Sequence, residues 1–167
     1  MKSIWIALFG IICCVGLFAD TLNGYVVGVS DGDTVKVLDA GKKQHRIRLL
    51  GIDAPESNQA FGQKSKQYLS SLIFNKNVSI TYKEKDQYGR ILGTIFYENE
   101  NINLKMVKAG LAWHYVYFAK DNKELAEAEA AARKEKLGLW KDPNPMPPWD
   151  FRRQKRNNSK KKQFKGE

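Results

Sequence analysis

The chain has 167 residues, of which 43% are hydrophobic, 28% charged and 11% aromatic, and its formal net charge is +10. This length and composition fit one domain with a buried core and exclude both a wholly disordered chain and a collagen-like chain. No apolar run reaches the roughly 20 residues that span a bilayer. The two cysteines, Cys13 and Cys14, are adjacent, which excludes a disulfide framework.

Residues 1–19 have the pattern of a signal peptide for export. Lys2 gives a positive start, residues 4–18 are mostly apolar, and Ala19 offers a small residue for cleavage. A buried N-terminal strand, a short membrane anchor and a lipoprotein acylated at Cys14 remain alternatives. If cleavage follows Ala19, the mature protein loses both cysteines and is secreted or periplasmic, with no stable membrane span.

The first half of the remaining chain carries mostly strand patterns and the second half mostly helical patterns. Valine-rich or alternating segments between turn residues predict five strands, at 24–29, 34–38, 44–50, 78–85 and 91–97. Apolar residues at helical spacing predict three helices, at 57–73, 104–111 and 125–137. We expect Gly110 to end the second helix, and residues 121–124 resemble a capping box before the third.

These elements predict one α+β domain over residues 20–141. Five strands with three helices can form a small, partly closed Greek-key β-barrel of the oligonucleotide-binding (OB-fold) type. The pattern alone does not establish that the barrel closes. Nothing in the sequence demands a partner subunit, so we expect a monomer.

The positive charge is concentrated at the C-terminus. Residues 152–167 contain eight basic residues and one acidic residue, whereas residues 20–151 are nearly balanced. We interpret 142–151 as a Pro-rich extension that Trp149 and Phe151 pack back onto the domain. A tail as polar as 152–167 buries little apolar surface, so we expect it to be disordered. Its charge serves either solubility or attraction to a polyanion, and composition leaves both open.

Two acidic clusters stand at the ends of predicted strands. Asp31-Gly32-Asp33-Thr34 lies between the first two strands, and Asp53-Ala54-Pro55-Glu56 follows the third. Alone, the first can be a simple turn and the second a favourable helix N-terminus. Together, two carboxylates and a backbone carbonyl form a hard oxygen site suited to Ca²⁺, with a weak affinity of roughly 10⁻⁴–10⁻³ M. A zinc site is not expected, because His45 and His114 lack ligand spacing.

Arg48 and Arg90 are candidates for stabilising the transition state of phosphodiester cleavage. A phosphodiester attacked by water gains negative charge on its phosphate oxygens, and a guanidinium stays protonated while it binds two of them. Glu56 can orient or deprotonate the attacking water. A salt bridge to a nearby acid is the commoner fate of an arginine on a strand, so these residues alone leave that explanation open.

Two longer motifs combine these residues in a fixed order. The first runs from Asp31-Gly32-Asp33-Thr34-Val35 through Arg48-Leu49 to Ile52-Asp53 and Pro55-Glu56, and the second is Asp86-Gln87-Tyr88-Gly89-Arg90-Ile91-Leu92-Gly93. Two ordered motifs at this spacing are far more specific than either one. Over about residues 24–140 the chain resembles the staphylococcal nuclease (thermonuclease) family.

This resemblance implies a five-stranded OB-fold β-barrel with three helices. It also implies a calcium-dependent endonuclease that hydrolyses DNA and RNA and leaves 3′-phosphate ends. The corresponding metal ligands are the carboxylates of Asp33 and Asp53 and the carbonyl oxygen of Ala54. The corresponding catalytic residues are Arg48, Glu56 and Arg90. Substrate would be bound by Tyr88 at a phosphate and by Tyr115 and Tyr117 at the nucleotide.

The chain departs from the family pattern at two positions. Ala54 stands where the family often has threonine, which removes a side-chain hydroxyl but keeps the backbone ligand, and Gln87 replaces a usual basic residue. The alternative function is a catalytically inactive OB-fold protein that binds nucleic acid. Such a protein has no need for the catalytic trio together with both calcium-binding aspartates. A surface adhesin that works through its basic tail is a further alternative.

Overall fold

The computed structural model describes residues 19–163. Residues 1–18, with both cysteines and nearly all of the predicted signal peptide, lie outside this range, as do residues 164–167. None of the helices within 19–163 combines the length and the apolar character needed to cross a membrane.

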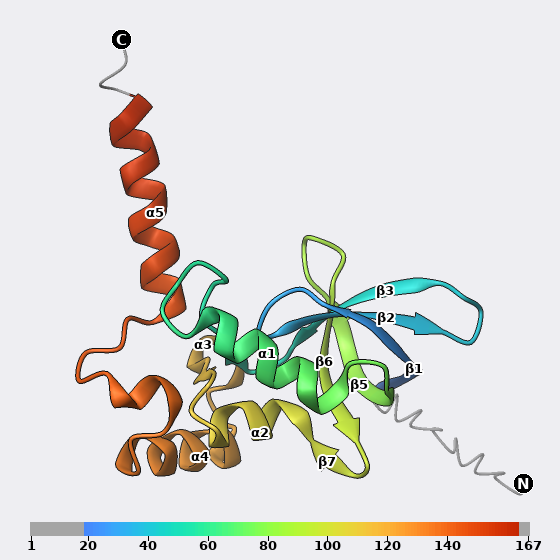
Figure 1. Cartoon of the computed structure of the whole chain (residues 1–167). Helices are drawn as coiled ribbons and strands as arrows, with labels where there is room; N and C mark the ends of the chain where they lie inside the picture. Colours follow the sequence, from blue (N-terminus) through green and yellow to red (C-terminus); the bar gives the residue numbers. More distant parts are fainter. Residues whose placement is uncertain (1–18, 164–167) are drawn as a thin grey trace, which may run out of the picture.

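A closed β-barrel forms the centre of the domain (Figure 1). Its five strands are β1 (Asp20–Val29), β2 (Thr34–Asp39), β3 (Gln44–Leu49), β5 (Asn77–Lys85) and β6 (Ile91–Tyr97). They follow the order β3-β2-β1-β5-β6, and a parallel pairing of β3 with β6 closes the barrel. The two-residue strand β7 (Glu100–Asn101) pairs with β6, and β4 (Ile52–Asp53) pairs separately with β8 (Trp113–His114). The predicted five-stranded OB-fold is therefore confirmed.

Alternating aliphatic side chains fill the barrel. In β2, Val35 and Val37 are buried and the residue between them is exposed, and in β3 Ile47 and Leu49 are buried on either side of the partly buried Arg48. Each such side chain stabilises the fold by about 1.5–3 kcal/mol when it is buried. Because successive side chains of a strand point to opposite faces, Arg48 lies on the face opposite to its two buried neighbours. The strand that builds the core therefore also directs a guanidinium away from it.

The three predicted helices are present. They are α1 (Gly62–Ile73), α2 (Ile102–Lys108) and α4 (Lys123–Lys134). Helix α1 starts later than predicted, and α2 and α4 each start two residues earlier and end three residues earlier. The side chain of Asn122 caps α4 by accepting a hydrogen bond from the Leu125 N–H (3.0 Å), and α2 ends just before Gly110, whose φ is +65°. The sequence patterns did not predict the short helix α3 (Val116–Ala119) or the 3₁₀ helix η1 (Gly138–Lys141).

Helix α1 begins five residues later than predicted, and the difference shapes the site. The Gln59 N–H donates to the Glu56 carbonyl (2.8 Å), and the Gly62 N–H donates to the Gln59 carbonyl (3.0 Å). Phe61 has a left-handed φ of +65°, and a Cβ at Gly62 would overlap the Glu56 carbonyl. Residues 57–61 therefore form turns that fold back on Glu56 instead of a first helical turn.

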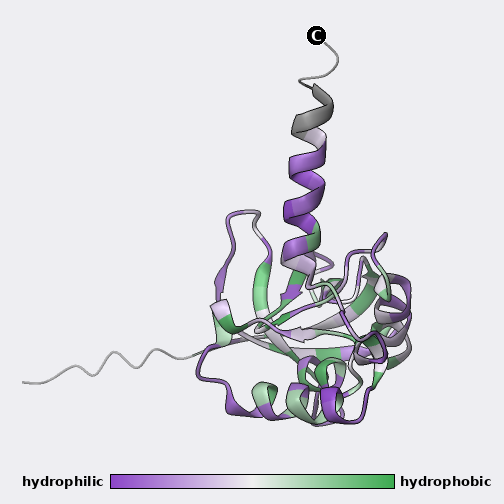
Figure 2. Cartoon of the chain, turned by 90° about the vertical axis from the view of Figure 1, so that its left-hand side faces the viewer, coloured by the Kyte–Doolittle hydropathy of each residue, from purple (hydrophilic) through white to green (hydrophobic). Residues whose placement is uncertain are grey.

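The C-terminal segment is a helix, so the prediction of a disordered tail over 152–167 is wrong for the part of it that the structure describes. Helix α5 (Pro148–Gln163) begins within the Pro-rich extension 142–151. Proline suits the first position of a helix, and the lysine, arginine and glutamine residues that follow are good helix formers. Figure 1 shows α5 projecting from the domain, and Figure 2 shows it as hydrophilic over most of its length.

A second apolar cluster anchors the base of α5. Trp113, Trp140 and Trp149 meet edge to face, with ring centroids 4.5 Å apart for Trp113 and Trp140 and 5.5 Å apart for Trp113 and Trp149. The guanidinium of Arg133 lies 3.8 Å from the ring centroid of Trp140. Trp149 therefore packs the C-terminal extension onto the domain, as expected from the sequence.

Candidate active site

Asp33 ends the loop between β1 and β2, and its carboxylate is buried. Its Oδ2 accepts a hydrogen bond from the Ala54 N–H (2.7 Å). A Cβ at Gly32 would overlap the Ser65 hydroxyl on α1, so only glycine lets this loop lie so close to the helix. The loop thereby fixes Asp33 beside the second acidic segment.

Asp53 is fully buried at the end of β4. The pairing of β4 with β8 places it opposite Trp113, and the Tyr115 N–H donates to the Gly51 carbonyl (2.8 Å) one residue beyond β8. This pairing brings the segment with Tyr115 alongside the acidic segment. A buried carboxylate is costly unless it is paired, and Asp53 has partners in two arginines.

Arg48 joins the two acidic clusters. Its Nη2 donates to Asp53 Oδ1 (2.7 Å), and its Nη1 lies 2.6 Å from Asp33 Oδ2, as an ion pair that is not aligned for a hydrogen bond. The Arg48 side chain is only 13% exposed. One buried guanidinium therefore holds carboxylates from two different loops together.

Burial is the largest single influence on the pKa of each of these groups, and for the two carboxylates it also sets the direction of the shift. It raises the pKa of Asp33 to about 6, although the charge of Arg48 acts in the opposite direction. Burial also raises the pKa of Asp53, against a hydrogen bond from Arg152 and the charge of Arg48. For Arg48 burial alone lowers the pKa, but the carboxylates of Asp33 and Asp53 outweigh it and raise the pKa above its usual value. These carboxylates lie in surroundings where a cation is strongly attracted.

Glu56 completes an acidic site that we define as Asp33, Asp53 and Glu56. Arg152 of α5 bridges the last two: its Nη2 donates to Asp53 Oδ2 (2.7 Å), and its Nη1 donates to Glu56 Oε1 (2.8 Å) and to Asp53 Oδ1 (3.2 Å). Desolvation lowers the pKa of Arg152, but the hydrogen bonds to Asp53 and Glu56 outweigh it and raise the pKa. Three carboxylates and two guanidinium groups thus share one site.

Arg90 and Tyr88 lie on the turn between β5 and β6, and within the described chain the Arg90 guanidinium is bound outside the acidic site. Its Nε donates to Asp86 Oδ2 (2.7 Å) and it lies 5.6 Å from the ring centroid of Tyr88, which is exposed. Burial raises the pKa of Asp86, but hydrogen bonds from Arg90 outweigh this and lower it. Because β6 runs parallel to β3, with Leu92 beside Arg48, Arg90 lies immediately before the start of the neighbouring strand.

Tyr115 and Tyr117 form an aromatic surface next to the acidic segment. Their ring centroids are 6.1 Å apart, and Tyr117 is 80% exposed. Trp149 of α5 stacks on Tyr115, with centroids 5.4 Å apart and an interplanar angle of 23°. One aromatic ring is therefore open to solvent and the other is covered by α5.

The acidic site fits a hard cation in charge and donor type, but its side chains do not form a ready metal cage. Within residues 19–163, no three His, Cys, Asp or Glu side chains are grouped to hold a metal ion. The carboxylates converge instead on guanidinium groups, Asp33 and Asp53 on Arg48, and Asp53 and Glu56 on Arg152. Calcium would have to take carboxylate oxygens that these arginines use.

Comparison with known proteins identifies the family to which this chain belongs. Residues 46–142 match the family model described as "Staphylococcal nuclease homologue". The chain belongs to the staphylococcal nuclease family. Of the predicted site residues, the match to this nuclease family includes all except Asp33, which lies before it.

Similar proteins carry nuclease names. An "Uncharacterized endonuclease" of Haemophilus influenzae is 48% identical over 133 residues, which are 80% of this chain and 74% of that protein. A "Micrococcal nuclease" of Shigella flexneri is 41% identical over 172 aligned positions, which cover 94% of this chain and 98% of that protein. These relatives and the family membership support a nuclease.

The structure of this family member brings together some of the predicted site residues and adds two others. Hydrogen bonds and ion pairs link Asp33, Arg48, Asp53 and Ala54, and Arg152 links Glu56 to Asp53. The described contacts of Arg90, Tyr88 and Tyr117 are with other residues. Sequence reasoning did not assign Arg152 and Trp149 to the site. The signal for α5 was Pro148 followed by Trp149, a helix start with an aromatic anchor, but nothing in the sequence identified the partners of Arg152.

Proposed function

We propose that this staphylococcal nuclease homologue is a calcium-dependent endonuclease that hydrolyses phosphodiester bonds of DNA and RNA and leaves 3′-phosphate ends. The observation that supports it best is the buried Arg48 guanidinium shared by Asp33 and Asp53, with Glu56 alongside. A protein that only bound nucleic acid would gain little from buried carboxylates, because they repel a polyanion.

Each group has a chemical role in this proposal. The carboxylates of Asp33 and Asp53 and the carbonyl oxygen of Ala54 would hold Ca²⁺, which when bound would neutralise phosphate charge. Arg48, and Arg90 from the neighbouring strand, supply positive charge to the phosphate oxygens as negative charge grows on them. Glu56, which is 39% exposed, accepts the proton of the attacking water or orients that water.

Substrate contacts would lie around this centre. The exposed Tyr88 is suited to donate a hydrogen bond to a phosphate, and Tyr115 and Tyr117 to stack on bases. Stacking on an aromatic ring contributes about 1–3 kcal/mol per base and does not depend on the base, which suits a nuclease that accepts both DNA and RNA.

The test is digestion of single-stranded DNA and of RNA by purified residues 20–167, with Ca²⁺ and with excess chelator. We expect digestion only with Ca²⁺, products that polymerase extends only after 3′-phosphatase treatment, and loss of digestion in Glu56→Gln. The matched control is Glu127→Gln on the exposed face of α4, which should digest like the parent chain. Binding of both substrates without any cleavage would instead establish the inactive nucleic-acid-binding alternative.

We also propose that residues 1–19 direct export and that the mature protein, a monomer, is secreted or periplasmic. The support is the charged start, apolar stretch and small residue at position 19. Sequencing of the N-terminus of protein recovered outside the cytoplasm should give Asp20 as its first residue. A first residue of Met1 would contradict cleavage.

A further inference from the structure

Arg152 binds the acidic site as a bound cation would. Both oxygens of Asp53 accept hydrogen bonds from its guanidinium, at 2.7 and 3.2 Å, and Glu56 Oε1 accepts a third at 2.8 Å. These bonds join charged groups, and Asp53 is fully buried whereas the side chains of Arg152 and Glu56 are 38% and 39% exposed. Arg152 comes from a segment 99 residues further along the chain than Asp53.

The same turn of α5 covers the aromatic surface. Trp149, three residues before Arg152, stacks on the ring of Tyr115 at 5.4 Å. A base cannot stack on this face of Tyr115 while Trp149 lies there. The start of α5 therefore covers two proposed functional residues: Arg152 binds the proposed metal ligand Asp53, and Trp149 covers the proposed nucleotide contact Tyr115.

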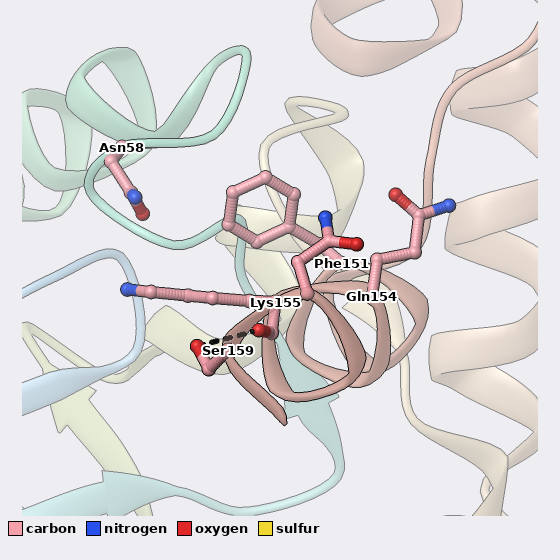
Figure 3. A pocket seen from close by; sticks show the side chains of 6 residues that line it. Asn58, Phe151, Gln154, Lys155 and Ser159 are labelled. Carbon is pink, nitrogen blue, oxygen red and sulfur yellow. Dashed lines mark hydrogen bonds between the residues drawn. The ribbon is translucent and has the colours of Figure 1, made fainter. Parts of the chain in front are cut away.

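The rest of α5 is loosely attached. Among the described residues, the ion pairs between α5 and the barrel domain are all made by Arg152, and Arg153 pairs within the helix with Asp150. A groove of about 380 Å³ separates α5 from the loop that carries Asn58, and Figure 3 shows Phe151, Lys155 and Ser159 lining it with Asn58. Since the Arg152 side chain is itself 38% exposed, water can reach the bonds that hold the helix in place.

A divalent cation and the Arg152 guanidinium compete for Asp53. Both need the same carboxylate oxygens, and Asp53 already binds the guanidinium groups of Arg48 and Arg152, so a third cation on this buried carboxylate would be repelled by both. We propose that α5 is an internal inhibitor of the active site: Arg152 occupies Asp53 and Glu56, and calcium binds only as Arg152 leaves. This inference depends on the calcium site of the proposed function.

Calcium binding, measured without any substrate, tests the inference. Isothermal titration of residues 20–167 with Ca²⁺ should show an affinity that rises by about tenfold or more in Arg152→Gln, because the competing charge is gone. Arg152→Lys, which keeps the charge, should bind Ca²⁺ like the parent or only slightly more tightly. The matched control is Arg153→Gln, one residue along the helix and 68% exposed, which should leave the affinity unchanged.

A distance measurement gives an independent result. The mature chain has no cysteine, so spin labels at Asn58→Cys and Ser159→Cys report on the groove alone. We expect the distance between the labels to lengthen or broaden when Ca²⁺ is added.

The outcomes separate this inference from the proposed function. Equal Ca²⁺ affinity in the parent and Arg152→Gln would overturn the inhibitor and leave the calcium site standing, as would an unchanged label distance with Ca²⁺ bound. An affinity that falls in Arg152→Gln would mean that Arg152 supports the site and would also overturn the inference. If neither chain binds Ca²⁺, both the inference and the proposed calcium dependence fail.

Discussion

Replacement of the buried guanidinium in Arg48→Met should destabilise the protein through the carboxylates that it leaves behind. Arg48 pairs with Asp33 at 2.6 Å and with Asp53 at 2.7 Å, and all three side chains are largely buried. Loss of one partner of a buried ion pair costs about 3–5 kcal/mol, because the remaining charge is uncompensated. Methionine keeps much of the apolar stem of arginine, so the lost charge should dominate the effect.

The structure indicates which end of this range of destabilisation applies to Arg48→Met. Asp53 keeps Arg152 as a partner in the variant, whereas Asp33 loses its ion pair and keeps only hydrogen bonds from the Ala54 N–H and the Thr34 hydroxyl. We therefore expect a loss near the lower end, about 3 kcal/mol. For a domain of this size that loss corresponds to a melting temperature lower by about 6–12 °C.

Urea denaturation at neutral pH, with chelator and then with excess Ca²⁺, measures the effect. Ca²⁺ should restore part of the lost stability in Arg48→Met, since it supplies the missing positive charge. The matched control is Arg46→Met, two residues earlier on β3 and exposed, which should change the free energy of unfolding by less than about 0.5 kcal/mol. Equal stability of Arg48→Met and Arg46→Met would refute the electrostatic reasoning.

Three further predictions concern the pKa of Asp33, the loop at Gly32 and the exposed positive charge of α5. The raised pKa of Asp33, about 6 against 3.8 in the unfolded chain, means that the folded protein holds an extra proton between these values. In chelator, the contribution of Asp33 to the free energy of unfolding is therefore fully present below about pH 4, and it falls by about 3 kcal/mol as the pH rises through 6. Asp33→Asn should remove this component from urea denaturation measured across that range, and an unchanged profile would contradict it. Gly32→Ala should push the loop away from α1, because its Cβ would overlap the Ser65 hydroxyl, and lower the free energy of unfolding by about 1–3 kcal/mol; unchanged stability would mean that the loop adapts freely. Neutralising three cations of α5 that lie exposed in its described part should weaken binding to long DNA and lower the salt dependence by up to about one unit of slope per charge, while cleavage of short oligonucleotides persists; loss of short-substrate cleavage would show a role in the centre itself. These cations are Arg153, Lys155 and Arg156.

The barrel and the centre of the site could be predicted because local patterns specify them. Alternation in β3 places Arg48 on the face opposite the core, and the register of β2 with β3 puts Thr34, next to Asp33, opposite Arg48. A turn at Asp31–Asp33 and a strand end at Asp53 then bring the carboxylates to one edge. Short-range periodicity and turn residues thus carried enough information for this part.

Other features depend on contacts that no local pattern encodes. The start of α1 was misjudged because the predicted helix was extended back from an apolar stripe that begins at Phe61, over residues that the backbone of Glu56 and Gly62 forces into turns. The disorder prediction for 152–167 rested on composition, which does not reveal the ion pairs of Arg152 with Asp53 and Glu56 that anchor α5. Because Asp53 and Arg152 are far apart in sequence, only the folded chain identifies their pairing.

The dependence of DNA cleavage on Ca²⁺ concentration tests the central claim most directly. Residues 20–167 should cleave single-stranded DNA with half-maximal rate at roughly 10⁻⁴–10⁻³ M Ca²⁺, and Asp53→Asn should need far more Ca²⁺ or show no cleavage. Cleavage by the parent chain that continues undiminished in excess chelator would contradict the account.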